Sequence, residues 1–450
     1  SFITIRFMSS LPNPEKMSPL EKRASVGLAS VYGLRMFGLF IILPVFALFA
    51  EHLPGGDNFT LVGIALGAYG LTQAILQIPF GWLSDRIGRK PVIYLGLVLF
   101  AIGSFIAATA IDIYWVIAGR VIQGAGAISA AVMALAADLT REEHRTKAMA
   151  MIGMTIGATF AISLMIAPLL NQWIGVPGIF VMTGLLAIIA IIVVHKIIPD
   201  PIVSRFHSDA EVSKSRFSTA LRHPELLRLN YGIFALHAVL MALWLVVPLS
   251  LREAGLAADH HWQMYLPVLV LSVLLMIPAI IYGEKKAKLK PVFITAIALL
   301  TIGQGLIAFT NQSLWGIGIA LVIFFTAFNL LEASLPSLIS KIAPVEAKGT
   351  AIGIYSSTQF LGAFVGASLG GYLYQHVGLT AIIVFCTMLL LVWLYFAFTM
   401  KSPAAVRSKM YHVAEMDNQR ANGLSRELAA LPGVHEALVL ANEQVAYLKV

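Results

Sequence analysis

The sequence predicts an all-α membrane protein of twelve transmembrane helices in two six-helix halves, followed by a small C-terminal α+β segment. Three observations support this prediction. Apolar residues make up 58% of the 450 residues and charged residues 12%, about half the charged share of a typical soluble protein. Apolar runs long enough to cross a bilayer recur along the chain. The short polar connections between these runs hold most of the Lys and Arg.

The twelve predicted spans follow the apolar runs in chain order. They lie at 25–50, 60–83, 91–111, 113–138, 147–170, 177–197, 229–251, 262–283, 291–310, 313–341, 349–375 and 378–400. Several contain glycine or proline, such as Pro79 and Pro168. In water these residues would argue against a helix, but a membrane bundle tolerates them because its neighbouring groups satisfy the freed backbone.

The distribution of basic residues predicts the orientation. Of the 31 Lys and Arg, Arg35 and Arg120 lie inside predicted spans and Arg252 lies in an odd-numbered loop. All the others fall in the termini, in even-numbered loops or at the span ends that border those loops (Lys147, Lys196 and Lys341). Because basic residues stay on the cytoplasmic side, we expect both termini in the cytoplasm, which agrees with an even number of spans. Topology thus accounts for the formal net charge of +8, and we expect no nucleic-acid partner.

The longest polar connection divides the spans six and six. The predicted parts are a cytoplasmic N-terminal segment at 1–24, a six-helix half at 25–197, a cytoplasmic linker at 198–228, a second half at 229–400 and a cytoplasmic tail at 401–450. The halves also resemble each other. "RKPV" at 89–92 recurs as "LKPV" at 289–292, and "KAMAMIGM" at 147–154 recurs loosely as "AKGTAIGI" at 347–354. Two matches at one offset and at equivalent positions indicate parallel repeats, as in a two-domain transporter.

A charged turn joins the second and third predicted spans and reads "FGWLSDRIGRKPV" at 80–92. It resembles the signature loop of the major facilitator superfamily, G-x-L-x-D-R-x-G-R-[KR]. The matching residues are Gly81, Leu83, Asp85, Arg86, Gly88, Arg89 and Lys90. With twelve spans and a central cytoplasmic loop, residues 25–400 are identified as a member of that superfamily. The resemblance implies a secondary transporter that works by alternating access.

A second motif lies in the fourth predicted span, "AGRVIQGAGA" at 118–127. It is similar to the R-x-x-Q-G-x-G motif of the drug:proton antiporter branch of the superfamily. The matching residues are Arg120, Gln123, Gly124 and Gly126. The fifth span lacks the Gly-Pro pair usual in that branch, and the first span lacks a membrane acid. These departures bear on proton coupling and drug export and leave the fold unaffected.

The resemblance favours a conformational latch in the charged turn over a solvated charge cluster. Asp85 can cap a helix N-terminus, where the dipole favours an anion; in this family that helix is the eleventh span, which begins here near Gly349 and Thr350. Arg89 can pair with Asp85 and with Asp138 at the end of the fourth span. Such a cluster would bridge the halves only when the cytoplasmic side is closed. At a partly wet site it would contribute about 1–3 kcal/mol.

Four ionisable residues lie inside predicted spans, where a charge is costly and usually functional. Arg35 either pairs with backbone carbonyls or lines a central cavity that attracts anions. For Arg120 the branch motif implies a role in coupling or substrate binding. Glu332 is the one carboxylate well inside a span, which makes it the best candidate for a proton carrier, with helix packing as the alternative. His237, at a similar depth, is either a core residue or a proton or substrate site.

Uncharged polar residues in the spans are further candidates for the wall of a substrate cavity. They are Tyr69, Gln73, Gln77 and Asn329.

The polar C-terminal stretch predicts a small soluble domain. "GLSRELAALPGV" at 423–434 is typical of a helix with Leu424, Leu428 and Leu431 on one face. "HEALVLANEQVAYLKV" is typical of two strands around an Asn-Glu turn. With a strand near 410–416, the order resembles part of a ferredoxin-like domain that is incomplete here. Metal-binding relatives of that domain use a Cys-x-x-Cys, which this chain lacks, so we expect no metal.

The sequence therefore predicts a proton-coupled secondary transporter of the bacterial inner membrane that exports a small solute. The chain contains no G-x-x-x-x-G-K-[ST] motif for ATP, so a gradient should supply the energy, and we expect no cofactor. We expect a monomer whose partners are the small-molecule substrate, protons and the lipid bilayer. A uniporter or importer of the same fold and a non-transporting sensor with the tail as output stay open. An enzyme is not expected, because motifs such as HExxH and GxSxG are absent.

Overall fold

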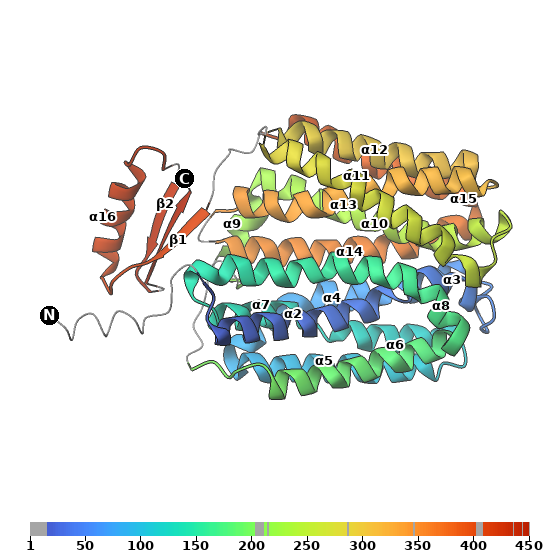
Figure 1. Cartoon of the computed structure of the whole chain (residues 1–450), viewed down its shortest axis with the longest axis horizontal. Coiled ribbons are helices and arrows are strands. Elements are labelled where there is room, and N and C mark those ends of the chain that lie inside the picture. Colours follow the sequence, from blue (N-terminus) through green and yellow to red (C-terminus); the bar gives the residue numbers. More distant parts are fainter. Residues whose placement is uncertain are drawn as a thin grey trace.

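The computed structural model describes residues 16–202, 211–213, 216–285, 288–344, 347–401, 408–434, 436–442 and 444–449. Helices dominate it, and a small sheet follows them (Figure 1). The helices are α2 (Pro19–Phe40), α3 (Leu43–Ala50), α4 (Phe59–Ile87), α5 (Arg89–Ala108), α6 (Ile113–Ala125), α7 (Ser129–Asp138), α8 (Glu142–Lys196), α9 (Phe217–Arg222), α10 (Pro224–Glu253), η2 (Ala258–His260), α11 (Trp262–Lys285), α12 (Leu289–Thr310), α13 (Leu314–Ile342), α14 (Lys348–His376), α15 (Leu379–Thr399) and α16 (Asn418–Ala429). The strands are β1 (Ser408–His412), β2 (Glu436–Leu440) and β3 (Val445–Lys449).

Among the described residues, ten helices are long and apolar enough to cross a membrane. They do not include α14, which packs between α4 and α10. The first and fourth predicted spans are each divided, into α2 and α3 and into α6 and α7. The fifth and sixth predicted spans lie in one long element, α8. The helix breaks there at Gly175, where φ is 67° and ψ is 172°. The apolar runs therefore predicted where the helices lie. The breaks between α2 and α3, between α6 and α7 and at Gly175 are seen only in the structure.

Local capping fixes where several helices begin. The Ser18 hydroxyl accepts from the Glu21 backbone N–H, and the Glu21 carboxylate accepts from the Ser18 N–H, which forms a complete capping box at α2. Asn58 and Asp112 cap α4 and α6 through their side-chain oxygens, and Ser313 caps α13. These caps satisfy backbone donors that the first turn of a helix leaves unpaired. They explain why the boundaries follow polar residues in otherwise apolar sequence.

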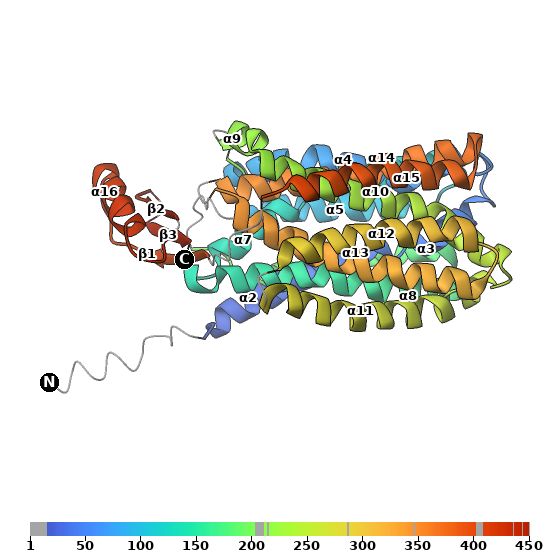
Figure 2. The same cartoon turned by 90° about the horizontal axis from the view of Figure 1, so that it is seen from above.

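The helices form one elongated bundle. In both views α9, the start of α2 and the sheet lie at the same end, and α3 lies at the opposite end (Figures 1 and 2). We call these the linker end and the far end, because residues 198–228 include α9. Large apolar side chains are exposed along the outer helices, for example Leu271 and Leu274 on α11 and Leu391 on α15. A surface of this kind suits contact with lipid hydrocarbon.

The internal repeat is visible as equivalent contacts in the two halves. Lys90 and Lys290 occupy matching places in the "KPV" repeat, in the first turns of α5 and α12. The Lys90 Nζ donates to the Ile198 carbonyl at 2.7 Å, and the Lys290 Nζ donates to the Phe398 carbonyl at 2.9 Å. Each lysine thus caps the end of the last helix of its own half, where carbonyls lack intrahelical partners. A pair of contacts at the same 108-residue separation supports structural duplication beyond the sequence match.

The C-terminal domain has a three-stranded antiparallel sheet in the order β1-β3-β2, with α16 against one face. Its core joins Ala421 of α16 to Val439 and Ala446 of the sheet, with Leu424 and Leu428 packed around them. The predicted helix and the two-stranded hairpin are therefore both present.

The predicted boundaries in this domain were wrong by several residues. The helix starts at Asn418 rather than at 423, because the Asp417 carboxylate accepts from the Arg420 N–H at 2.7 Å and caps it. It ends at Ala429, so Leu431 lies beyond the helix and is half-exposed instead of joining the apolar face. The first strand lies at Ser408–His412 rather than at 410–416.

We expect the helix bundle to fold without this domain. Its core, its cap and its sheet are internal to residues 408–449. A chain that ends near residue 405 should therefore elute from size exclusion in mild detergent as one symmetrical peak, with a melting temperature close to that of the full chain. Aggregation or loss of membrane insertion in the shortened chain would contradict this expectation.

Candidate functional site

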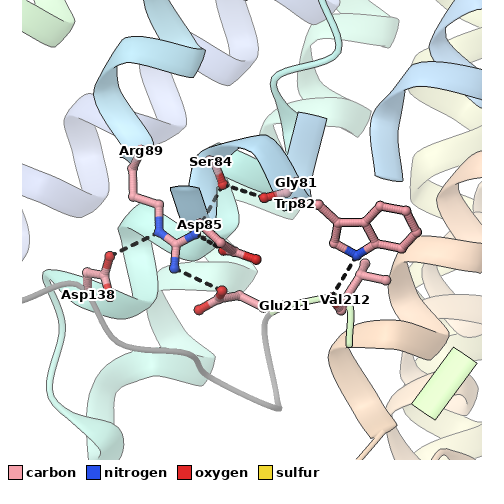
Figure 3. A network of polar contacts seen from close by, with 8 residues as sticks. All are labelled: Gly81, Trp82, Ser84, Asp85, Arg89, Asp138, Glu211 and Val212. Carbon is pink, nitrogen blue, oxygen red and sulfur yellow. Dashed lines mark hydrogen bonds and ion pairs between the residues drawn. The ribbon is translucent and has the colours of Figure 1, made fainter. Parts of the chain in front are cut away.

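A buried arginine is the centre of a polar network at the linker end. Arg89 is the first residue of α5, and its side chain is 3% exposed. Its Nε donates to the Asp138 carboxylate at 3.2 Å, and its Nη1 donates to the Ser84 hydroxyl at 3.0 Å and to Asp85. Its Nη2 lies 2.8 Å from Oε2 of Glu211. Figure 3 shows Ser84 and Asp85 of α4, Asp138 of α7 and Glu211 of the linker around the Arg89 guanidinium of α5.

The linker is fixed to both halves at this network. Glu211 pairs with Arg89 of the first half, and the neighbouring Val212 carbonyl accepts from the Trp82 indole N–H at 3.1 Å (Figure 3). The Ser213 N–H then donates to the Thr350 hydroxyl of α14, in the second half, at 2.8 Å. We call Glu211, Val212 and Ser213 the linker clasp. Three consecutive residues thus connect α4 and α5 to α14.

The clasp changes the predicted geometry of the latch. The sequence predicted that Asp85 caps α14 near Gly349 and Thr350. In the described residues Asp85 bonds to Arg89 and makes no hydrogen bond to either of them. At this end the clasp contacts both helices, through Trp82 of α4 and Thr350 of α14, and a Cβ added to Gly353 of α14 would come within 2.4 Å of the Val212 side chain.

The remaining signature residues have separate places. Arg86 is exposed at the end of α4, and Gly81 packs near Ala130, whose Cβ would lie 3.0 Å from an added Cβ. Gly88 links α4 to α5 with φ at +101°, a conformation that L side chains rarely adopt. Lys90 points away from the network to Asp200, 2.8 Å from its carboxylate, and this hydrogen bond and charge hold the pKa of Asp200 below its ordinary value.

The far end carries its own bridge between the halves. Arg252, at the end of α10, donates from Nη1 and Nη2 to the two carboxylate oxygens of Glu51 at 2.6 and 2.8 Å. The Phe59 N–H of α4 donates to the Gln375 side chain of α14 at 2.7 Å. Arg252 was the exception in the predicted charge distribution, and its position opposite Glu51 gives that exception a structural reason.

We expect the Glu51–Arg252 pair to hold the far end closed. Both side chains are partly exposed, so the bidentate pair should contribute about 0.5–1 kcal/mol. Arg252→Glu or Glu51→Arg alone should lengthen the distance between spin labels at Ile111→Cys, in the loop after α5, and Phe309→Cys, at the end of α12, in a Cys386→Ser background. The swapped double variant should restore the parent distance. Additive effects in the double variant would count against the pair.

A pocket lies between the halves, away from both bridges. Its walls are mostly apolar and come from both halves; they comprise Met36, Leu39, Phe40, Leu43, Leu66, Gly67, Tyr69, Gly70, Ile156, His237, Leu240, Met241, Gln359, Phe360 and Ala363. Polar groups enter it at Tyr69 on one side and at His237 and Gln359 on the other. Of the predicted cavity residues, Tyr69 is thus in the wall, whereas Asn329 is half-buried elsewhere on α13. His237, predicted as a core residue or as a proton or substrate site, also lines the pocket.

The two membrane arginines flank Tyr69 behind the pocket wall. The guanidinium carbons of Arg35 and Arg120 lie 5.7 and 5.3 Å from the ring centroid. Arg35 is 2% exposed and does not line the pocket, contrary to the predicted place in the cavity wall. It donates to the Gln73 side-chain oxygen, and the Gln73 amide donates to Gln77 at 3.4 Å. Gln73 and Gln77 therefore form a buried chain with Arg35 rather than a cavity surface.

The span-four motif anchors α6 to α4. Arg120 donates to the backbone carbonyls of Ala65 and Leu66 at 3.4 and 3.1 Å and to Gln123 at 2.8 Å. Gln123 in turn donates to the Ser104 hydroxyl at 2.8 Å.

The motif glycines permit close helix contacts. A Cβ on Gly124 would lie 2.2 Å from the Tyr69 carbonyl oxygen, and one on Gly126 would lie 2.2 Å from the Gly96 carbonyl oxygen. The motif therefore fixes Arg120 and the backbone at Tyr69 in position.

A second polar cluster joins three helices of the second half. Gln359 of α14 donates from Nε2 to Nε2 of His237 on α10 at 2.9 Å and to Oε1 of Glu332 on α13 at 3.4 Å. The His237 Nδ1 lies 3.3 Å from the Ile233 carbonyl oxygen, so Nδ1 carries a hydrogen and Nε2 accepts. The Glu332 Oε2 lies 3.8 Å from the same Nε2. This arrangement places a neutral imidazole beside a carboxylate next to the pocket.

Sequence reasoning missed four residues of these sites. Glu211 lies in a polar linker with no periodic pattern, and Trp82 looked like one more apolar residue of a span. Arg252 could have been singled out from the sequence, because it was the one basic residue in an odd-numbered loop. Gln359 had none beyond its polarity within a span.

Comparisons with known proteins show what the chain resembles. The family model for the Major Facilitator Superfamily matches residues 28–288 and 269–414. Inner membrane transport protein YajR of Escherichia coli K12 is 43% identical over 439 residues, which cover 97% of this chain and 96% of that protein. Multidrug resistance protein MdtH of Aeromonas hydrophila is 28% identical over 358 residues, 76% of this chain and 85% of that protein. The solved structure of the human organic anion transporter MFSD10 superposes with a TM-score of 0.64 at 18% identity and covers 84% of this chain and 100% of that chain, a likeness of fold.

Proposed function

Because the chain belongs to the Major Facilitator Superfamily, a family of membrane transporters and not of enzymes, we propose that it is a proton-coupled secondary transporter that exports a small solute by alternating access. The observation that carries this proposal is the pairing of two separate bridges between the halves with a pocket between them. Alternating access requires one gate on each side of a central site, since each gate opens in a different state.

The proposed topology has twelve crossings in two halves with both termini cytoplasmic. The ten apolar helices become twelve when α8 counts as two crossings about Gly175 and α14 is included. Support for α14 comes from its position between α4 and α10. The basic residues of the linker end favour the cytoplasm for that end, and the relative named an inner membrane protein favours the bacterial inner membrane. The β-α-β-β order of the tail fits the corresponding elements of a ferredoxin-like domain.

The linker clasp is the proposed cytoplasmic gate. Arg89 is held by Asp85 and Asp138, both of its own half, and the clasp adds Glu211. When the halves separate at this end, the Ser213–Thr350 hydrogen bond to α14 must break or the clasp must leave Arg89. Either change leaves a buried charged or polar group without a partner, so the closed state is favoured until another interaction offsets the cost.

Protons are proposed to act at the Glu332–His237 pair. With Nδ1 donating to Ile233, a proton that arrives at His237 Nε2 converts an acceptor into a donor. The Gln359 amide then cannot donate to that nitrogen, and it must rotate to present its oxygen. Because His237 and Gln359 both line the pocket, protonation changes the polar groups that face a bound solute. This linkage couples proton uptake to solute release.

Reconstituted vesicles test the proposal directly. Purified protein in proteoliposomes with entrapped pyranine and an imposed pH gradient should collapse the gradient faster when a transported solute from a panel of cationic, neutral and anionic compounds is added. Solute movement that ignores the gradient would instead establish a uniporter. Absence of movement for every compound, together with a protein partner that binds the tail, would establish a sensor.

A further inference from the structure

The Arg35 guanidinium has donors that the protein does not use. A guanidinium carries five N–H groups, and Arg35 donates from Nη2 to Gln73. Its Nε and Nη1 are buried and have no acceptor in the part of the chain that the structure describes, and the same holds for the Tyr69 hydroxyl. Buried donors in a protein are normally satisfied, and leaving them unpaired is costly. The missing acceptor should therefore come from outside the chain.

Charge leads to the same conclusion. The Arg120 guanidinium also lies near the Tyr69 ring, and the neutral oxygens of Ala65, Leu66 and Gln123 satisfy its donors. Within the described residues, no carboxylate lies within 4.0 Å of the guanidinium of Arg35 or Arg120.

The one carboxylate predicted well inside a span has other partners. Glu332 lies in the second half, beside His237 and Gln359. The first half thus holds two buried positive charges whose aromatic contact offsets only part of their desolvation.

The pocket is the available route to these donors. Tyr69 lines it, and so does Met36, the residue after Arg35. Most of the remaining wall is aliphatic or aromatic. A ligand that satisfies this site needs one compact negative group for these donors and an apolar body for the pocket wall. With both bridges closed, the cavity volume is about 30 Å³, so the body enters only as the halves separate. The free donors number two nitrogens of Arg35 and one hydroxyl, which suits the two oxygens of a carboxylate.

We infer that the pocket binds an amphiphilic organic carboxylate, with its carboxylate against Arg35 and Tyr69 and its apolar body between Phe40, Leu240 and Phe360. The inference rests on the proposed function for its consequence, which is that such an anion is the transported solute. Arg120 is a positioning residue in this arrangement, because its own donors hold α4 and α6 together while its charge attracts the anion.

Matched ligands on the full-length protein test the inference. Three sets share a body and differ in the polar group: benzoate, benzamide and benzylamine; 2-naphthoate, 2-naphthamide and 2-naphthylmethylamine; octanoate, octanamide and octylamine. We expect at least one carboxylate to raise the melting temperature in detergent and to bind, by calorimetry, at least about tenfold more tightly than its amide and amine. Equal affinity across each set, or no carboxylate binding in any set, overturns the inference.

Variants assign the effect to Arg35. Arg35→Gln should remove the preference for the carboxylate, Arg35→Lys should keep part of it, and Tyr69→Phe should weaken it while keeping the ring. Arg23→Gln, which removes an exposed arginine of the same helix, should change nothing. If Arg35→Gln does not fold, the comparison of polar groups on the parent and the Tyr69→Phe result still decide the matter. Binding without gradient-driven flux would refute the proposed transport but would support the carboxylate site. Gradient-driven flux of amines alone would support the proposed transport but would refute the carboxylate site.

Discussion

Glu211→Gln is expected to open the linker end. The substitution keeps the size of the side chain and removes the charge that faces Arg89 at 2.8 Å, where both side chains are less than 5% exposed. Asp85 and Asp138 still neutralise Arg89, so the loss should be about 1–3 kcal/mol. That change corresponds to about a 5- to 150-fold shift in a two-state equilibrium. Spin labels at Ile197→Cys and Tyr282→Cys, on α8 and α11 in a Cys386→Ser background, should report a longer distance.

Asp138→Asn is the matched control for this experiment. It removes an equally buried charge from the same guanidinium, but it connects α7 to α5 within one half. We expect it to lower the melting temperature with little change in the linker-end distance. Identical linker-end distances in Glu211→Gln and the parent would show that the linker clasp is not part of the gate. An increase in both variants would mean that the total charge around Arg89 matters rather than the bridge.

A cycle with Asp85→Asn separates the two acids. If both act through Arg89, the double variant with Glu211→Gln should be less than additive, because each change weakens one shared cluster. Asp85→Asn alone should act like Asp138→Asn, with little change in the linker-end distance, because Asp85 also pairs with Arg89 within the first half and, among the described residues, makes no hydrogen bond to α14.

The sequence was informative wherever the physical cause is local. Apolar runs decide which segments enter a membrane, and they located the helices within a few residues. The "KPV" repeat indicated equivalent positions, and the Lys90 and Lys290 contacts bear this out. The Arg89 environment followed in part from motif spacing, since Asp85 is one helical turn away.

The rest depends on how distant segments meet. Glu211 reaches Arg89 only because a linker with no periodicity folds back between α4 and α14, and no pattern in the sequence encodes that path. The direction in which the Arg35 side chain points from its helix was equally unpredictable from the sequence. One residue along a helix turns a side chain by about 100°, which separates Met36 in the pocket wall from Arg35 behind it.

Glu332→Gln is expected to abolish gradient-driven transport while the protein still exchanges one solute molecule for another. Glutamine keeps the shape and can still accept from the Gln359 amide, so the packing of α13 and α14 should hold. The variant loses the one group beside His237 that can take up and release a proton as a carboxylate.

With one proton exchanged per solute molecule and no membrane potential, a pH gradient can concentrate the solute about tenfold per pH unit. The parent should approach this ratio in proteoliposomes, and Glu332→Gln should stay near unity with exchange intact. Glu253→Gln, which removes an exposed acid at the far end of α10, should behave like the parent. Full accumulation in Glu332→Gln would exclude Glu332 as the proton carrier, and His237→Gln would then be the variant in which driven transport is lost. Loss of exchange together with driven transport would show that Glu332 holds the helices or the solute rather than the proton.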